Sequence, residues 1–328
     1  MIAFLARRLA YMAITVLLVS LVSFLIVQAA PGDYAAIYAA KKAATGAIIR
    51  QADIDAVRVE LGLDKPWYVQ YGLWLTNAVF HADFGQSWQW KRPVGEVIAE
   101  RMPLTLAIAF GTLIFMYAIS IPVGIYAAVK RYSFGDYASS LVGYLGLATP
   151  NFLLALVLMY LGQRYFGQSA GGLFSPAYAS APWSLAKFWD MLKHLIVPVV
   201  VLGTAGTAFL IRAMRAAVLD ELDKMYVLSA KASGLSPLQL LIRYPVRVAL
   251  NPIASTLGWR LTYVISGAPI VGYVMALPDT GPLFLGALLN QDMQLAGAMI
   301  FIYCVLTIIG TLVSDVLLVL LDPRIRLE

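Results

Sequence analysis

Long apolar blocks alternate with polar segments along the whole chain. Six of the blocks are close to the length that crosses a bilayer, which takes roughly 20 residues of α-helix. They cover residues 9–30, 104–129, 138–160, 195–210, 248–274 and 295–320. The pattern predicts an all-α, polytopic membrane protein with six transmembrane helices, of which the fourth is short.

Prolines interrupt several of the apolar blocks. Pro122, Pro150 and Pro198 each lie inside one. A proline kinks a transmembrane helix and frees a carbonyl group, which is tolerated where the helix faces protein neighbours or a cavity. The sequence therefore predicts kinked spans that pack against one another.

Basic residues lie at the ends of the apolar blocks and indicate the sidedness of the chain. Arg7 and Arg8 precede the first block, and the segment 211–247 carries six Lys and Arg residues. Because Lys and Arg mark cytoplasmic loops, both termini and this segment are expected in the cytoplasm. The segments 31–102 and 164–193 then lie outside.

Composition and charge agree with a membrane protein. Hydrophobic residues make up 61% of the chain and charged residues 13%, whereas soluble domains carry about 25% charged residues. The net charge of +6 is distributed over the ends of the apolar blocks and forms no contiguous basic face. It therefore reflects membrane topology, and no nucleic-acid partner is expected.

The apolar blocks also suggest a division of the chain into three parts. Residues 1–30 are expected to form the cytoplasmic N-terminus and the first transmembrane helix. Residues 31–102 are expected to form an extracytoplasmic segment, which would be periplasmic in a bacterial inner membrane, and residues 103–328 a core of five transmembrane helices that includes the cytoplasmic segment 211–252.

The segment 31–102 is expected to lie on the membrane as a small cap. Asp53 is a plausible N-cap for an amphipathic helix that carries Ile54, Val57 and Leu61. The Trp and Tyr residues around this helix suit a membrane–water interface.

The segment 211–252 is too charged to lie in lipid and too apolar for a solvated tether. Gly234 suits the left-handed end of a helix, and Ser236 with Pro237 suits the start of the next. Apolar residues at helical spacing accompany this second helix: Leu235, Leu238, Leu241 and Ile242. The sequence predicts two short helices joined by a sharp bend, which form either an interfacial loop or a docking element for a cytoplasmic partner.

Motifs of catalysis and nucleotide binding are absent from the sequence. It contains no GxxxxGK[ST] loop, no GxSxG nucleophile elbow and no HExxH helix. Cys304, His81 and His194 are the only residues of their kinds, so no metal-ligand cluster is expected. Any nucleotide that powers this chain is therefore expected in a partner.

Two ionisable residues fall inside predicted spans. Arg260 lies near the middle of the fifth block, where a charge is costly unless it faces a cavity or a partner. It either lines a polar path for a solute, or it snorkels or pairs with an acid on a neighbouring helix. Asp315 lies near the end of the sixth block, within reach of cytoplasmic arginines, and is expected to form a structural ion pair.

A set of short motifs in a fixed order carries a resemblance to a known family. In chain order they are Pro31-Gly32-Asp33, Leu61-Gly62-Leu63-Asp64-Lys65-Pro66 with Val69-Gln70-Tyr71, Asp83-Phe84-Gly85-Gln86-Ser87, Tyr226-Val227, Ala230-Lys231-Ala232, Gly234-Leu235-Ser236, Asn251-Pro252 and Asp322-Pro323-Arg324-Ile325-Arg326. Over essentially its whole length the chain resembles the permease subunits of binding-protein-dependent ABC importers, in the dipeptide/oligopeptide/nickel branch.

The resemblance implies a fold, a location and a set of partners. The fold is that of a type I ABC importer permease in the bacterial inner membrane. The partners are a second homologous permease, two ATP-binding subunits and a periplasmic solute-binding protein. ATP and Mg are bound by the ATPase subunits, so this chain is a non-catalytic subunit that holds no cofactor.

The resemblance also implies that 211–252 is the coupling loop, which carries the "EAA" signature and docks into a groove of the ATPase subunit. The residues expected to make this coupling are Tyr226, Ala230, Lys231, Gly234, Leu235 and Leu238. Force transfer is expected through Ala230, Gly234, Leu235 and Leu238, with Gly234 setting the bend.

Two departures from the family pattern concern the signature and the solute. Leu228-Ser229-Ala230 stands where the signature has Glu-Ala-Ala. Gly272 and Pro278-Asp279-Thr280-Gly281 replace the more usual acidic residue and Pro-Gly-Leu-Gly stretch of peptide permeases. The solute is therefore expected to be a peptide or, alternatively, an oligosaccharide such as an α-galactoside. A secondary transporter is a third reading, for which only Arg260 and Asp315 offer coupling residues.

Overall fold

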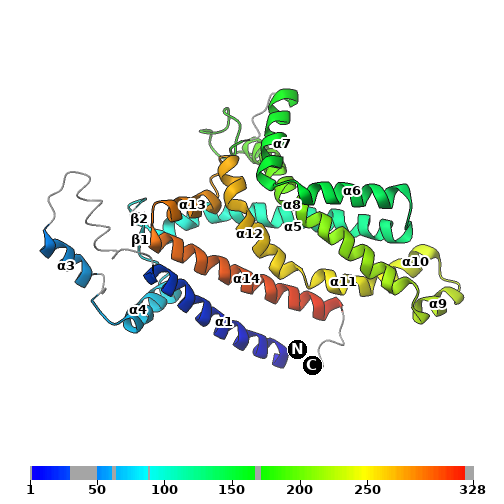
Figure 1. Ribbon diagram of the computed structural model, residues 1–328, viewed down its shortest axis with the longest axis horizontal. Helices are drawn as coiled ribbons and strands as arrows, with labels where there is room; N and C mark the ends of the chain where they lie inside the picture. Colours follow the sequence, from blue (N-terminus) through cyan, green and yellow to red (C-terminus); the bar gives the residue numbers. More distant parts are fainter. Residues whose placement is uncertain (1, 30–49, 61–63, 88, 167–170, 322–328) are drawn as a thin grey trace. The chain divides into compact units, whose positions relative to one another are not determined.

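The computed structural model describes residues 2–29, 50–60, 64–87, 89–166 and 171–321. Helices dominate these residues (Figure 1). The chain forms two compact units. Unit 1 comprises residues 1–9, 101–283 and 305–328, and unit 2 comprises residues 10–100 and 284–304. The motifs at 31–33, 61–63 and 322–326 lie outside the described residues, and the predicted division at residues 30 and 102 stays a prediction.

The elements follow one another in a single order along the chain. They are α1 (Ile2–Ala29), α3 (Gln51–Glu60), α4 (Trp67–Phe80), β1 (Gln86–Ser87), β2 (Arg92–Pro93), α5 (Val94–Val129), α6 (Phe134–Ala148), α7 (Asn151–Phe166), α8 (Leu185–Leu222), α9 (Met225–Ala232), α10 (Pro237–Leu241), the π-helical turn η1 (Ile242–Val246), α11 (Arg247–Ala254), α12 (Leu257–Val274), α13 (Thr280–Leu289) and α14 (Met293–Leu321).

Among the described residues, four helices are long and apolar enough to cross a membrane, and a bent helix pair gives a fifth candidate. The four lie in α1, α5, α8 and α14, and the pair is α6 with α7. These agree with the first, second, third, fourth and sixth predicted spans. The fifth predicted span, 248–274, is divided between α11 and α12, so the count of six is consistent with the structure and stays a prediction.

Helix α8 is much longer than the predicted fourth span, 195–210. It has 38 residues and is therefore about 57 Å long at 1.5 Å per residue. It begins after Ser184, whose side chain accepts a hydrogen bond from the Lys187 N–H. Beyond residue 210, Met214 and Val218 continue a fully buried stripe at a spacing of four residues. The predicted span ended too early because the charged residues after residue 210 were taken as the end of the helix. The buried stripe continues past them.

The third predicted span, 138–160, is two helices rather than one kinked helix. Helices α6 and α7 meet at an angle of 104°. Thr149 ends α6 in an extended conformation, with φ −86° and ψ 121°. A residue that precedes proline is disfavoured in the helical region because its backbone clashes with the proline ring. Pro150 therefore breaks the helix at residue 149 instead of bending it.

Unit 1 is assembled around α8. Helices α6, α7, α11 and α12 each contact it, and α7 also contacts α12. Figure 1 shows α6 running alongside α8. The largest fully buried side chains of this unit include Met116, Leu210, Met214 and Ile253. Hydrophobic burial between these helices holds the unit together.

One ion pair of unit 1 was expected from the sequence. The Arg8 guanidinium lies 2.9 Å from the Asp315 carboxylate. The prediction that Asp315 pairs with a nearby arginine is confirmed. The pair joins the start of α1 to the last third of α14.

Unit 2 has an aromatic core between α1, α4 and α14. The Phe24 ring lies 5.6 Å from that of Tyr71 and 6.1 Å from that of Trp74. Trp74 in turn makes an edge-on contact with Phe301 at 5.6 Å. The Ser20 and Tyr71 hydroxyl groups share a hydrogen bond of 2.8 Å. Helix α4 is thereby fixed to both longer helices.

Two acidic side chains organise local turns in unit 2. Helix α3 begins two residues before Asp53, which accepts a hydrogen bond of 2.9 Å from the Arg50 N–H. The prediction that Asp53 is the N-cap is therefore wrong by position, since Asp53 lies in the first turn. The fully buried Asp292 accepts hydrogen bonds from the Ser87 hydroxyl and the Gln89 N–H, and so fixes the β1–β2 hairpin to the start of α14.

Candidate functional site

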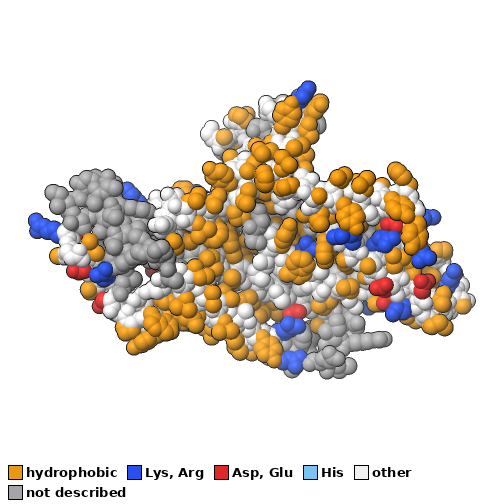
Figure 2. Space-filling view, in the orientation of Figure 1, with side chains coloured by type: hydrophobic (Ala, Val, Ile, Leu, Met, Phe, Trp, Pro, Cys, Tyr) orange, Lys and Arg blue, Asp and Glu red, His pale blue; other side chains and the backbone are white. Residues whose placement is uncertain are grey.

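The best-defined candidate site is the bent segment, which we define as residues 223–247. It follows α8 directly and contains α9, the turn at Gly234, α10 and η1. Figure 2 shows Lys, Arg, Asp and Glu side chains concentrated at this end of unit 1, where the rest of the visible surface is largely hydrophobic. The loop predicted at 211–252 thus begins inside α8, because residues 211–222 are helical.

The sharp bend has the predicted geometry. Gly234 has φ +83°, in the left-handed region. The chain changes direction at this residue, just after the end of α9. Ser236 then accepts a hydrogen bond from the Gln239 N–H, and Pro237 occupies the first turn of α10. These three observations confirm the predicted helix end, N-cap and first turn.

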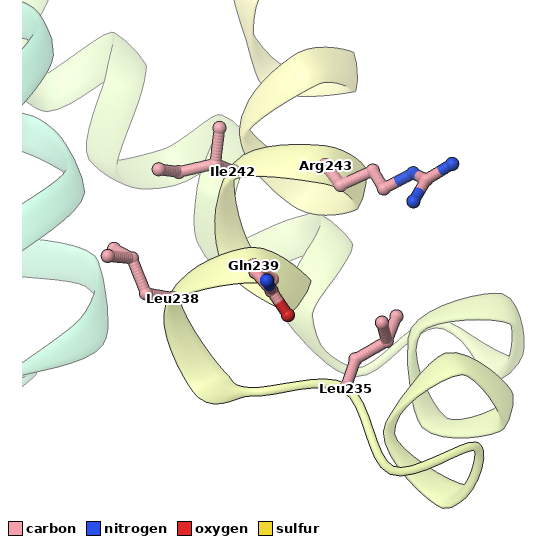
Figure 3. Close-up of a pocket in the computed structure, with 5 residues that line it drawn as sticks. All are labelled: Leu235, Leu238, Gln239, Ile242 and Arg243. Atoms are coloured by element: carbon pink, nitrogen blue, oxygen red, sulfur yellow. The ribbon is translucent and has the colours of Figure 1, made fainter.

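The second half of the bent segment presents apolar side chains to the outside. Leu238 is 66% exposed and Ile242 is 58% exposed. Leu235, Leu238, Gln239, Ile242 and Arg243 line a hollow of about 450 Å³. In Figure 3, Leu238 and Ile242 project to one side of the turn and Arg243 to the opposite side. An apolar side chain this exposed at the end of a membrane protein is suited to contact with another protein.

The first half of the bent segment has an inner and an outer face. Val227 and Ala230 are buried, whereas Leu228 and Lys231 are exposed. Helix α9 contacts α10, so Ala230 supports the fold of the segment and is not part of its surface. Of the predicted coupling residues, Tyr226, Lys231 and Leu238 are accessible, and Leu235 is half-buried.

Tyr226 anchors α9 to the end of α8. Its hydroxyl donates a short hydrogen bond to the Glu221 carboxylate, and its ring lies 6.3 Å from that of Tyr244. Partial burial, together with the Glu221 carboxylate, raises the pKa of Tyr226 to about 12. Tyr226 therefore stays protonated and keeps donating at any physiological pH.

The sequence predicted that the segment consists of two short helices. In the structure it continues beyond the second of them, α10. It continues through η1, a π-helical turn that contains Pro245, directly into α11. Proline has no N–H to donate to the preceding turn, and a single π-helical turn inside an α-helix is a common feature of functional sites. The bent segment is thus joined to α11 without a flexible linker.

An ion pair that the sequence analysis missed holds the region before the bent segment. The Arg215 Nε and Nη2 atoms donate hydrogen bonds of 2.8 Å each to the Asp136 carboxylate. Ser133 and Asp136 form a capping arrangement at the start of α6, in which Asp136 also accepts from the Tyr132 N–H. The spacing Ser-x-x-Asp is a recognisable capping signature, but it gives no indication of Arg215.

Arg260 lies at the start of α12 and is buried, with 4% of its surface exposed. Its guanidinium lies 4.0 Å from the Trp259 ring centroid and 4.4 Å from that of Phe209. Among the described residues, its Nε and Nη2 atoms have no hydrogen-bond partner and no acid forms an ion pair with it. Both alternatives for Arg260, a polar path for a solute or a side chain that snorkels or pairs with an acid, stay predictions.

Asp279, part of the unusual 278–281 stretch, is also buried, at 2% exposed. Its carboxylate accepts a hydrogen bond from the Gly281 N–H and lies against Gly272, where a Cβ atom would approach it to 2.7 Å. Burial raises the pKa of Asp279 to about 7. The two departures noted in the sequence, Gly272 and Asp279, therefore meet at one place.

Comparison with known proteins identifies the family. Residues 120–327 match the family described as binding-protein-dependent transport system inner membrane component, and residues 1–109 match the N-terminal family of the same components. The chain belongs to this family. It is an inner membrane permease component of an ABC importer, as the resemblance implied, and the secondary-transporter reading is set aside.

Relatives of this permease align over its full length. The oligopeptide transport system permease protein AppB of Bacillus subtilis is 35% identical over 99% of this chain and 100% of its own. A putative peptide transport system permease protein of Brucella abortus is 33% identical, with complete coverage of both chains. The dipeptide transport system permease protein DppB of Escherichia coli is 30% identical over 99% of each chain.

The family membership also bears on the predicted role of the chain. A permease component of an ABC importer is a non-catalytic subunit, since ATP hydrolysis belongs to partner ATPases, and it works with a solute-binding protein. These parts of the prediction are confirmed. The coupling role of the residues in the bent segment and the solute role of Arg260 stay predictions.

Proposed function

We propose that this permease imports peptides. The relatives are named for oligopeptides, peptides and dipeptides, and they align with this chain from end to end. None of these names refers to an oligosaccharide, so the alternative based on the 278–281 stretch has no support from them. Gly272 and Asp279 are then a variation within a peptide permease.

The permease forms one half of a transmembrane dimer, with a second homologous permease as the other half. Two ATPase subunits bind below the dimer and hold the ATP and Mg, while this chain binds no cofactor. Both termini and the bent segment face the cytoplasm. The basic residues before α1 and along the bent segment support this orientation.

The observation that supports docking to the ATPase subunits is the exposed apolar turn of the bent segment. Leu238 and Ile242 project from a turn that is fixed at both ends, by α8 on one side and by η1 and α11 on the other. A rigid apolar projection fits a groove on a partner, and burial of two such side chains contributes several kcal/mol, at roughly 1.5–3 kcal/mol each.

The same arrangement supports a mechanism for coupling. At its first end the bent segment is joined directly to α8. At its other end it leads through η1 and α11 to α12. A displacement of the segment by ATP-driven closure of the ATPase subunits moves these helices together. ATP binding and hydrolysis then favour different arrangements of the helices, which alternately open the path to the two sides.

The experiment that tests the function uses the complex purified through a tag on this chain. The complex is reconstituted with its binding protein, and ATP hydrolysis is measured after addition of di- to pentapeptides or of α-galactosides. We expect stimulation by peptides alone. Stimulation by the oligosaccharides alone would overturn the solute class, and the absence of a co-purifying ATPase would overturn the docking role of the bent segment.

A further inference from the structure

The strongest unassigned feature of the molecule is the guanidinium of Arg260. The group is buried, yet its Nε and Nη2 atoms have no acceptor among the described residues. An arginine side chain stays protonated in proteins, and a buried charge without a counter-charge is strongly destabilising. The Trp259 and Phe209 rings offset only part of this through cation–π attraction. The site is therefore suited to an anionic ligand.

The same chain shows what this edge of a guanidinium binds. Arg215 presents its Nε and Nη2 atoms to the two carboxylate oxygens of Asp136, at 2.8 Å each. The two atoms that lack an acceptor on Arg260 are the same pair, Nε and Nη2. This planar, two-donor edge matches a carboxylate in geometry as well as in charge. A carboxylate is therefore the chemical group expected at Arg260.

The aromatic neighbours restrict the direction from which such a group approaches. The ring centroids of Trp259 and Phe209 lie 4.0 and 4.4 Å from the guanidinium carbon, and the two rings contact each other edge to face at 6.0 Å. Because these rings lie over the guanidinium, they hold its position. A ligand is then bound at the edge of the group, in its plane.

The depth of Arg260 fits a translocation path. Thr262, two residues further along α12, donates a hydrogen bond of 2.8 Å to Thr307, which lies at the middle of the 29-residue helix α14. A Cβ atom at Gly206 would lie 3.6 Å from the Arg260 Nη1 atom and would overlap Met116. Helices α5, α8 and α12 therefore meet around the guanidinium, close to the middle of α14.

We propose that Arg260 binds the carboxylate of the transported peptide as it crosses the membrane. The inference rests on the proposed function, since it requires a peptide solute. Peptides carry a terminal carboxylate whatever their side chains, so a single arginine at mid-depth serves peptides of many sequences. The other source of a carboxylate is an Asp or Glu of the second permease subunit, and the test distinguishes the two.

The test compares one peptide as the free acid and as the C-terminal amide. Both are supplied to proteoliposomes that contain the full complex, ATP and the binding protein, each at a concentration that saturates the binding protein. Import is measured for the unchanged protein, Arg260→Gln and Arg260→Lys. Arg164→Gln is the matched control, because Arg164 also lies over two aromatic rings but is exposed.

We expect the unchanged protein and Arg164→Gln to import the free acid about tenfold faster than the amide, or more, as for a charge-assisted hydrogen bond. Arg260→Gln should lose most of the free-acid import and bring this ratio close to one. Arg260→Lys keeps the charge but not the two-donor edge, so its ratio should be intermediate. Basal ATP hydrolysis should be unchanged in the control Arg164→Gln, whose arginine is exposed and lies outside the proposed site.

Two results would contradict the inference. Import rates that are unchanged for both peptides in Arg260→Gln would show that Arg260 does not contact the carboxylate of the peptide. An equal loss for acid and amide would identify the carboxylate of the second subunit, or a structural role, instead. If Arg260→Gln fails to assemble, the ratio in Arg260→Lys decides in the same way. Failure of the unchanged protein to import either peptide would instead overturn the proposed function.

Discussion

Asp136 and Arg215 lie 79 positions apart in the sequence, and their side chains make two parallel hydrogen bonds of 2.8 Å. The pair joins the first turn of α6 to α8, two turns before the bent segment begins. The Asp136 side chain is 5% exposed and that of Arg215 is 28% exposed. This difference makes the consequences of removing either partner unequal.

Arg215→Gln should destabilise the protein more than Asp136→Asn. The first change leaves a buried carboxylate with few donors, whereas the second leaves a guanidinium that water can reach. Breaking a buried pair costs about 3–5 kcal/mol, and the exposure of Arg215 places Asp136→Asn below that range. Thermal unfolding in detergent measures both. The double variant should lose less stability than the sum of the two single losses, and additive losses would show that the pair is not coupled.

Gly234→Val should abolish uptake while the protein still inserts into the membrane. At φ +83° a non-glycine residue is strained by roughly 1–2 kcal/mol, and a β-branched residue is among the least tolerant. Within the part of the chain that the structure describes, no atom lies within 4 Å of a Cβ at this position, so the effect is one of backbone conformation alone. Gly234→Asn is the matched control, because asparagine accepts this conformation. Uptake assays and membrane yield test it, and normal transport by Gly234→Val would count heavily against the docking role.

Leu238→Asp combined with Ile242→Asp should separate the ATPase subunits from the permease. Both side chains are more than half exposed, so the charges should not disturb the fold of the permease, but a charge buried in an apolar groove would oppose docking. Co-purification of the ATPase through a tag on the permease should fall at least tenfold. The control is Leu185→Asp, which alters a leucine of similar exposure, 74%, at the opposite end of α8. Retention of the ATPase by the double variant would argue against this contact surface.

The stability of the protein should fall as the pH rises from about 4 to about 7, and Asp279 should account for this slope. Burial raises the pKa of Asp279 from the ordinary range of a carboxyl group to about 7. In this interval the folded protein holds a proton at Asp279 that the unfolded chain has released, so stability decreases with pH. Above pH 7 both states are deprotonated and the contribution of Asp279 is constant. The expected decrease is of the order of a few kcal/mol.

The measurement for Asp279 is the Tm in detergent across this pH interval. In Asp279→Asn the slope should be reduced, because asparagine does not titrate. A variant that kept the full slope would show that Asp279 is not the group responsible. Thr280→Val is not a suitable control, since Thr280 exchanges hydrogen bonds with Thr105.

Much of the fold was predictable because its signals are local. The apolar blocks identified most of the long helices, and Gly234, Ser236 and Pro237 located the bend within one residue. The Asp315 pair followed from the position of each residue at the end of an apolar block. The errors arose where local signals compete. Pro150 was read as a kink but breaks the helix, and the charges after residue 210 concealed the continuation of α8.

The sequence by itself determined the membrane class, the order of the helices, the bend of the bent segment and the absence of catalytic motifs. These depend on composition, periodicity and capping, which act over a few residues. Only the tertiary structure decided which distant groups meet: Asp136 with Arg215, Asp279 with Gly272, and Arg260 with the rings of Trp259 and Phe209. Side chains on different helices are brought together by packing of the whole unit, and no local pattern records that arrangement.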